Sequence, residues 1–120
     1  MLKLYIYAAC STCRKAMQWL DEANVRYLPI PIRETPPPLE ELDALLTAHQ
    51  DALTAISNTS GIDYRAQGIK EKLPLLSRKA ALELLGGNGS FLRRPIAVDA
   101  AKHIYLAGFR EAKWTAAFRK

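Results

Sequence analysis

Residues 2–13 read Leu2-Lys3-Leu4-Tyr5-Ile6-Tyr7-Ala8-Ala9-Cys10-Ser11-Thr12-Cys13, and this stretch carries the strongest structural signal in the chain. The alternating pattern over residues 2–7 predicts a β-strand. From residue 11 to about residue 23 the apolar side chains share one helical face, which predicts a helix directly after the strand. Cys10 and Cys13 are the only cysteines in the sequence and lie at this junction. Such a pair is typical of a redox-active dithiol.

The start of a helix is a chemically favourable place for this pair. The first helical turn has unpaired N–H groups and the positive end of the helix dipole, and both stabilise a thiolate over a thiol. The thiolate is the form that attacks disulfides and other electrophiles. Cys13 lies one helical turn after Cys10, so it is close enough to close a disulfide and release whatever the first thiol has captured.

Two other interpretations of the cysteine pair stay open at this point. The thiols can form a buried pair without chemistry, because free cysteine packs as a small hydrophobic residue. They can also bind zinc together with His49 and His103, but these spacings are far longer than in compact zinc sites. We therefore expect no metal, and we expect both histidines at the surface.

Composition limits the class of protein. The chain has 120 residues, of which 49% are hydrophobic, and this fits one domain with an ordinary core over residues 1–120. No apolar stretch is long enough for a membrane span, and the N-terminus does not resemble a signal peptide. We expect a cytoplasmic protein without membrane contact. The net charge of +5 fits an anionic substrate or a nucleic-acid neighbour, but the basic residues are scattered, so we expect no specific DNA binding.

The order of the expected elements predicts the fold class. The first third of the chain reads as strand, helix and strand, with the second strand over residues 25–33 and its prolines at a sheet edge. Helices follow at residues 39–49, 51–56 and from residue 77, and Thr35 is a candidate cap. A hairpin over residues 95–106 and a helix over residues 111–119 complete the chain. This order predicts an α/β, thioredoxin-like fold, β-α-β … β-β-α, with a mixed sheet and a helical insertion over residues 36–90.

Four segments resemble the glutaredoxin-coupled arsenate reductase family, which includes the Spx-type regulators that bind RNA polymerase. They occur in the family's order between residue 1 and about residue 110. They are Tyr7–Ala16 at the active-site turn, Arg33-Glu34-Thr35-Pro36-Pro37 at the start of the helical insertion, Ser57–Gly61 at a turn, and Leu92-Arg93-Arg94-Pro95-Ile96-Ala97-Val98-Asp99 at the arginine-proline strand.

The resemblance implies roles for particular residues. Cys10 corresponds to the nucleophile, and Cys13 is placed to resolve its adduct. Arg94 corresponds to an anion-binding partner, which also fits its chemistry, because a guanidinium beside a helix N-terminus is a good clamp for an oxyanion. Ser11 and Thr12, at the helix start, are expected to help bind that anion, and Pro95 is expected to be cis and to face the cysteine turn. Glutathione is the implied co-substrate, with no bound cofactor.

The sequence departs from the family's arginine pattern at two positions. The Asn58-Thr59-Ser60 turn has no arginine, and Gly108 stands where the last strand of the reductases carries one. Arg110, Arg93 and Arg65 are the candidates to replace them. With fewer charge-assisted contacts to an oxyanion, we expect arsenate reduction to be weak.

Three functions follow from these observations. The first is an arsenate-reductase-like thiol–disulfide oxidoreductase coupled to glutathione or glutaredoxin, and the length and the Thr35-Pro36-Pro37 segment favour it. The second is an Spx-type redox-sensing regulator that binds the RNA polymerase α subunit, and the two-cysteine motif fits it. The third is a glutathione-dependent disulfide reductase.

Overall fold

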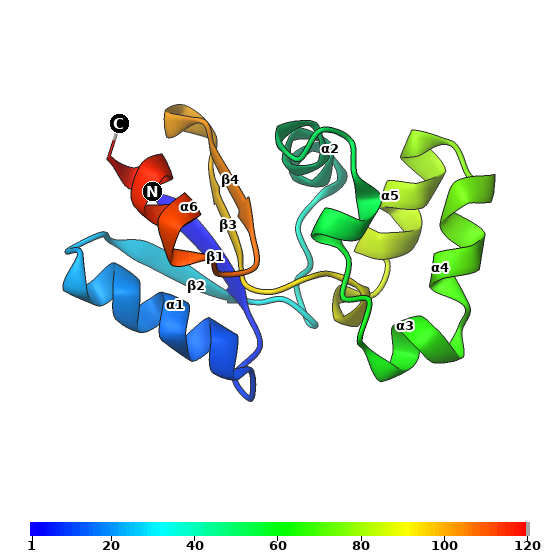
Figure 1. Cartoon of the computed structure of the whole chain (residues 1–120), viewed down its shortest axis with the longest axis horizontal. Helices are drawn as coiled ribbons and strands as arrows, with labels where there is room; N and C mark the ends of the chain where they lie inside the picture. The colour runs from blue at the N-terminus through cyan, green and yellow to red at the C-terminus, as the bar shows by residue number, and fades with distance from the viewer. Residues whose placement is uncertain (120) are drawn as a thin grey trace.

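The computed structural model describes residues 1–119 and measures 41 × 27 × 23 Å (Figure 1). Four strands and six α-helices alternate with short 3-10 turns along these residues. In chain order the elements are β1 (Leu2–Ile6), α1 (Ser11–Glu22), β2 (Tyr27–Pro31), α2 (Leu39–Ala48), η1 (Leu53–Ile56), α3 (Ile62–Ala66), α4 (Ile69–Lys72), η2 (Leu73–Leu75), α5 (Arg78–Gly86), η3 (Gly89–Phe91), β3 (Ile96–Asp99), η4 (Ala100–Lys102), β4 (Ile104–Ala107) and α6 (Glu111–Phe118).

The strands form one mixed sheet in the order β2-β1-β3-β4. β1 and β2 are parallel and joined by α1, whereas β3 pairs antiparallel with both β1 and β4. This confirms the predicted α/β, thioredoxin-like arrangement, in which a β-α-β unit and a β-β-α unit share a sheet. Because β1 and β2 are parallel, the loops after both strands lie at the same edge of the sheet.

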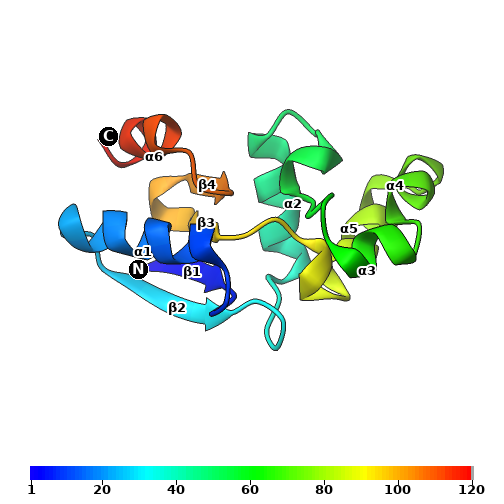
Figure 2. The same cartoon turned by 60° about the horizontal axis from the view of Figure 1, so that its bottom comes forward.

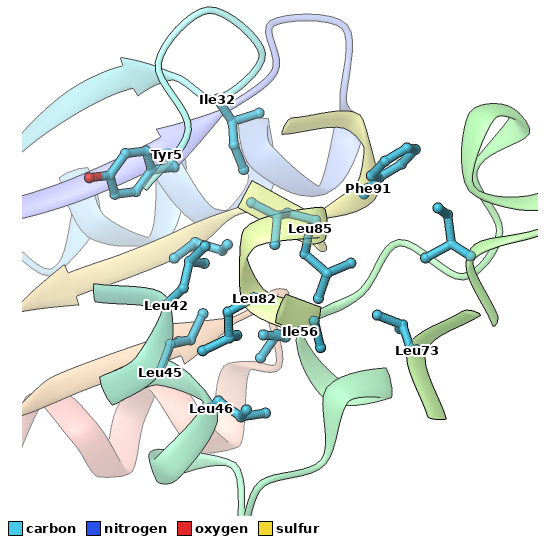
Figure 3. Packing of buried hydrophobic residues seen from close by; sticks show 14 of the residues in the cluster. Tyr5, Ile32, Leu42, Leu45, Leu46, Ile56, Leu73, Leu82, Leu85 and Phe91 are labelled. Atoms are coloured by element: carbon cyan, nitrogen blue, oxygen red, sulfur yellow. The ribbon is translucent and has the colours of Figure 1, made fainter. Parts of the chain in front are cut away.

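The two faces of the sheet have separate cores. α1 and α6 cover one face, and the helices between β2 and β3 lie toward the other (Figures 1 and 2). Alternate residues of β1 point to opposite faces, as a strand requires. Leu2 and Leu4 pack with Leu20 and Trp114 on the α1–α6 side. Tyr5 joins the larger core, in which leucines of α2 and α5 meet Ile32 and Phe91 (Figure 3).

A polar contact also ties the sheet to α2. The Tyr5 hydroxyl donates a 2.6 Å hydrogen bond to Glu41, and the Lys3 ammonium pairs with the same carboxylate. Burial, followed by the Glu41 hydrogen bond and charge, raises the pKa of the Tyr5 phenol, so Tyr5 remains a donor at neutral pH. Glu41 therefore holds α2 against the face of the sheet opposite α1.

Several boundaries differ from the sequence-based expectation. The second strand is shorter than residues 25–33, because β2 is an edge strand with exposed Leu28 and Pro29. Pro38, rather than Thr35, is the N-cap residue of α2. In α5 the fully buried leucines are Leu82 and Leu85, whereas Leu84 is only partly buried. The helices α3 and α4, which the sequence did not indicate, fill the chain between η1 and η2.

Over residues 1–119, no helix combines the length and apolar character needed to cross a membrane.

Candidate active site

Cys10 is the N-cap residue of α1 and its backbone is extended. The main-chain N–H of Cys10 donates to the Tyr7 carbonyl at 2.9 Å, which closes the turn that follows β1. The Cys10 Sγ atom accepts the N–H of Cys13 at 3.4 Å. A sulfur in this position takes the place that serine or aspartate oxygen usually takes at a helix start. The local sequence thus places the thiol at the positive end of the helix.

The surroundings of Cys10 favour its thiolate. Partial burial opposes ionisation, but hydrogen bonds from the side chain and N–H of Cys13 and from the N–H of Thr12, with the charge of Arg94, hold the pKa of the Cys10 thiol below its usual value. Ser11, the first helical residue, is exposed beside it. The N–H of Thr12 thus stabilises the Cys10 thiolate, and anion binding by Ser11 and Thr12 stays a prediction.

Cys13 has the opposite character. It is fully buried in α1, and both cysteines are free thiols. Burial is the main reason that the pKa of the Cys13 thiol is raised, and the neighbouring Cys10 sulfur adds to the shift. A thiol with a lowered pKa therefore lies one helical turn from a thiol with a raised pKa. This is the arrangement that lets one sulfur attack a substrate while the other waits to displace the product.

Arg94 reaches the cysteine turn from the start of β3. The Arg94–Pro95 peptide is cis, Pro95 is buried, and the Pro95 carbonyl accepts the N–H of Gly108 at 2.8 Å. The Arg94 guanidinium carbon lies 5.0 Å from the centre of the Tyr7 ring, within the range of a cation–π contact. Its Nη1 atom is buried and has no hydrogen-bond partner among residues 1–119. The structure thus brings the charge of Arg94 close to Cys10, 84 positions away in the chain.

Arg33 is a site residue that the sequence analysis did not identify. The Ile32 N–H donates to the Ile6 carbonyl at 2.9 Å, which extends the β1–β2 register beyond β2. Arg33 therefore emerges beside Tyr7, and its guanidinium carbon lies 4.0 Å from the Tyr7 ring centre. The parallel pairing of β1 and β2 is the feature that could have identified Arg33, because it places the residues after Ile6 and after Pro31 at one edge of the sheet.

Arg33 and Arg94 both line a pocket of about 480 Å³. Asn58 and Ser60, from the turn before α3, and Ser90, from η3, also line this pocket. Gly89 allows η3 to lie this close to the loop after β2, because a Cβ atom at Gly89 would lie 2.1 Å from the Ile32 carbonyl oxygen. The backbone of η3 therefore packs directly against the residue before Arg33.

The arginines considered as replacements lie elsewhere. The side chain of Arg93 runs over Gly108, whose φ is +73° and whose added Cβ would lie 2.9 Å from the Arg93 Cδ. Arg65 donates to the Thr59 carbonyl at 3.3 Å and lines a different pocket. Arg110 is the N-cap residue of α6. None of the three lines the pocket that contains Arg94.

The histidines do not join the cysteines. Nδ1 of His49 lies 2.8 Å from the Leu45 carbonyl oxygen at the end of α2, and His103 follows η4 in a left-handed conformation. Within residues 1–119, no three histidine, cysteine or acidic side chains cluster in a way that could hold a metal ion.

Comparison with known proteins gives one consistent result. The model of the ArsC family matches residues 5–117. The chain is 42% identical to the uncharacterised protein YusI of Bacillus subtilis, over 92% of both chains. It is 34% identical to the global transcriptional regulator Spx of Enterococcus faecalis, over 92% of this chain and 81% of that protein. The crystal structure of a possible arsenate reductase from Streptococcus mutans superposes with a TM-score of 0.86 and 36% identity, over 97% of each chain.

Proposed function

Because this chain belongs to the ArsC family, we propose that it is an arsenate-reductase-like thiol–disulfide oxidoreductase with Cys10 as its nucleophile. One observation supports this most directly. The Cys10 sulfur caps α1 beside Arg94 with a lowered pKa, while Cys13, one turn on, is buried with a raised pKa. Opposed pKa shifts in neighbouring groups are a mark of a functional site.

The proposed reaction with a disulfide RSSR has two steps. The Cys10 thiolate attacks one sulfur, the substrate S–S bond breaks, and one RS⁻ leaves, so that Cys10 carries a mixed disulfide. Cys13 then gives its proton to this first RS⁻, which becomes RSH, and as a thiolate it attacks the Cys10 sulfur. The mixed disulfide breaks and the second RS⁻ is released. The two cysteines end as a Cys10–Cys13 disulfide, and their oxidation supplies the two electrons that reduce the substrate. Glutathione or glutaredoxin is the proposed thiol reductant that restores the dithiol.

The test is a trapping experiment with 2-hydroxyethyl disulfide, a small uncharged substrate. In Cys13→Ala the mixed disulfide has no resolving thiol, so mass spectrometry should find one adduct per chain, on Cys10. The parent protein should pass to the internal disulfide without accumulating the adduct. Cys10→Ala should react far more slowly than Cys13→Ala, because its remaining thiol is buried and protonated. An adduct that forms on Cys13 as fast as on Cys10 would contradict the assignment.

Similarity to Spx supports a second candidate, a redox-sensing regulator that binds the RNA polymerase α subunit. In this reading the Cys10–Cys13 disulfide changes a binding surface instead of turning over a substrate. Purified α subunit should then bind the oxidised and reduced parent with different affinities. Cys10→Ala, which cannot form the disulfide, is the control and should bind equally well under both conditions. Absence of α-subunit binding in both states would remove this candidate.

A further inference from the structure

Tyr7 lies in the cysteine turn but takes no part in the proposed reaction. It directly follows β1, and its carbonyl accepts the Cys10 N–H at 2.9 Å. Its ring is half-buried, and the guanidinium carbons of Arg33 and Arg94 lie over it, 4.0 Å and 5.0 Å from the ring centre. Both distances are within the limit of about 6 Å for a cation–π contact. One aromatic side chain therefore contacts both the loop after β2 and the segment before β3.

This ring contact matters because the two guanidiniums repel each other. Their carbons can be no farther apart than the sum of the two ring distances, which is below the screening length of about 10 Å in 0.1 M salt. The ion pairs within residues 1–119 are those of Lys3 and Arg78, so no carboxylate is paired with Arg33 or Arg94. The face of an aromatic ring is negative and attracts a cation. The Tyr7 ring thus supplies an attraction that opposes the repulsion.

Arg94 depends on the contact more strongly than Arg33. Arg33 is exposed, so water can solvate its guanidinium, whereas Arg94 is half-buried and its Nη1 atom has no hydrogen-bond partner among residues 1–119. A buried N–H of a charged group without an acceptor is costly, and this cost favours a guanidinium that turns toward water. The contact with the Tyr7 ring opposes that movement. It therefore keeps the charge of Arg94 near Cys10, where that charge helps to lower the pKa of the thiol.

We propose that Tyr7 is a positioning residue for the Cys10 nucleophile, and that the face of its ring holds the Arg94 guanidinium at the cysteine turn. Arg33 is then a second cation that the same ring gathers. The role belongs to the electron density of the ring and not to the tyrosine hydroxyl. The inference rests on the proposed thiol–disulfide function for the identity of the nucleophile, but the contact can be tested without a substrate.

Other charged or titratable groups also surround the cysteine turn. They are Cys13 and Arg14 of α1, Arg33 of the loop after β2, Asp63 of α3, which lines a pocket with both arginines, and Arg94 before β3. Of these, Cys13 and Arg94 shift the pKa of Cys10. An effect of the Tyr7 ring on Cys10 should therefore require Arg94. This requirement distinguishes the proposed role from that of a ring that merely covers the sulfur.

The main test changes the ring face with little change in its size. Tyr7 is replaced by phenylalanine and by phenylalanines with one, two or three ring fluorines, which withdraw electron density and weaken the attraction for a cation. The rate of Cys10 alkylation by iodoacetamide is measured against pH by mass spectrometry of the Cys10 peptide. Tyr7→Phe should keep the inflection of the parent. Fluorination should move it stepwise to higher pH, so that three fluorines slow alkylation below the inflection about two- to fivefold.

Two matched series control this test. In the Arg94→Gln protein the same fluorinated rings should have no effect, as a double-mutant cycle requires of an interaction that needs both partners. Tyr27 is a half-buried tyrosine at the other end of the sheet, where it pairs with Leu2, and fluorinated rings at that position should leave the Cys10 inflection unchanged. An inflection that ignores fluorination at position 7, or that moves equally with and without Arg94, would overturn the inference.

A charged reagent tests the place of Arg33. The ratio of the Cys10 alkylation rate with iodoacetate to that with neutral iodoacetamide does not depend on the thiolate fraction, and it rises with positive charge around the sulfur. The ratio should fall about twofold in Arg33→Gln, and at least as much in Tyr7→Leu, which releases both guanidiniums. Arg26→Gln, before β2 at the other end of the sheet, should keep the parent's ratio. An unchanged ratio in Arg33→Gln would overturn the assignment of Arg33 as the second cation.

This inference and the proposed function fail in different ways. If the parent reduces no disulfide but fluorination shifts the Cys10 inflection, the oxidoreductase assignment is wrong and the role of Tyr7 holds. If the parent reduces disulfides and fluorination leaves the inflection in place, the oxidoreductase assignment holds and the role of Tyr7 is wrong.

Discussion

The chemistry of Cys10 depends on groups that come from two distant parts of the chain. The N–H groups of Thr12 and Cys13 are local to α1, whereas Arg94 arrives with β3. The local groups follow from the sequence, because the backbone N–H groups in the first turn of any helix lack helical partners. The contribution of Arg94 requires the β1–β3 pairing, which brings the residues before β3 next to the residues after β1.

The lowered Cys10 pKa predicts a specific pH profile for alkylation. Only the thiolate reacts, so the rate for Cys10 should rise with pH and level off above its folded-state pKa, at a lower pH than for a free cysteine of pKa about 8.5. Arg94→Gln should move the inflection to higher pH because it removes a stabilising charge. Arg14→Gln is the control, since Arg14 donates to the Ala8 carbonyl and is not among the groups that shift Cys10. An inflection for Cys10 at or above 8.5 would contradict the account of the thiolate.

The place of Arg33 beside the cysteine turn is not visible in the sequence. The segment from Arg33 to Pro37 resembles the start of a helical insertion, and nothing in it indicates that Arg33 lines a pocket with Arg94. That role depends on the exact register of β1 and β2 and on the close approach of Gly89 to the Ile32 backbone. Neither contact leaves a local pattern in the sequence, whereas the helix start at Cys10 does.

Glu41 holds α2 to the sheet, and its loss should destabilise the fold. Glu41→Ala leaves the buried Tyr5 hydroxyl without its acceptor, so the free energy of unfolding should fall by about 1–3 kcal/mol. Glu40→Ala is the matched control, because Glu40 precedes it in the same helical turn and is exposed. Urea unfolding at neutral pH gives both values. Equal stabilities of the two variants would show that the Tyr5–Glu41 contact contributes nothing.

The packing of η3 against the end of β2 should tolerate no side chain at Gly89. A Cβ there would lie within 2.1 Å of the Ile32 carbonyl oxygen, and both partners are backbone. Gly89→Ala should therefore lower the unfolding free energy by more than about 2 kcal/mol. Gly87→Ala, at the end of α5, is the comparison, and thermal unfolding should separate the two clearly.

The strands and long helices of the molecule could be foreseen, and the short helices α3 and α4 could not. β1 and α1 show strong periodic patterns, and the order of elements therefore predicted the mixed sheet. α3 and α4 have five and four residues, too few for a helical period to be visible. They form because their neighbours bury Tyr64 and Ile69 in the larger core, a tertiary effect without a local signal.

The expected rate of arsenate reduction depends on the positive charge that the fold brings to the pocket of Arg33 and Arg94. Within residues 1–119, Arg33 and Arg94 are the arginines that line the pocket, and Asp63 offsets part of their charge. We expect arsenate-dependent NADPH oxidation, coupled through glutathione and glutaredoxin, to be at least about tenfold slower than reduction of glutathione disulfide. Replacing Asp63 by Asn should raise the arsenate rate because it removes a repulsive charge. Arsenate turnover faster than disulfide turnover would contradict this expectation.

The central claim is that Cys10 and Cys13 act as one two-electron redox couple, and an equilibrium titration tests it most directly. The parent protein is brought to equilibrium in glutathione buffers of defined potential, and its free thiols are counted by mass after alkylation. We predict that both thiols disappear together, with a tenfold change in the reduced-to-oxidised ratio for every 30 mV or so. Cys10→Ala should instead keep its Cys13 thiol. Two thiols that stay free in the parent at potentials where glutathione itself is oxidised would contradict the account.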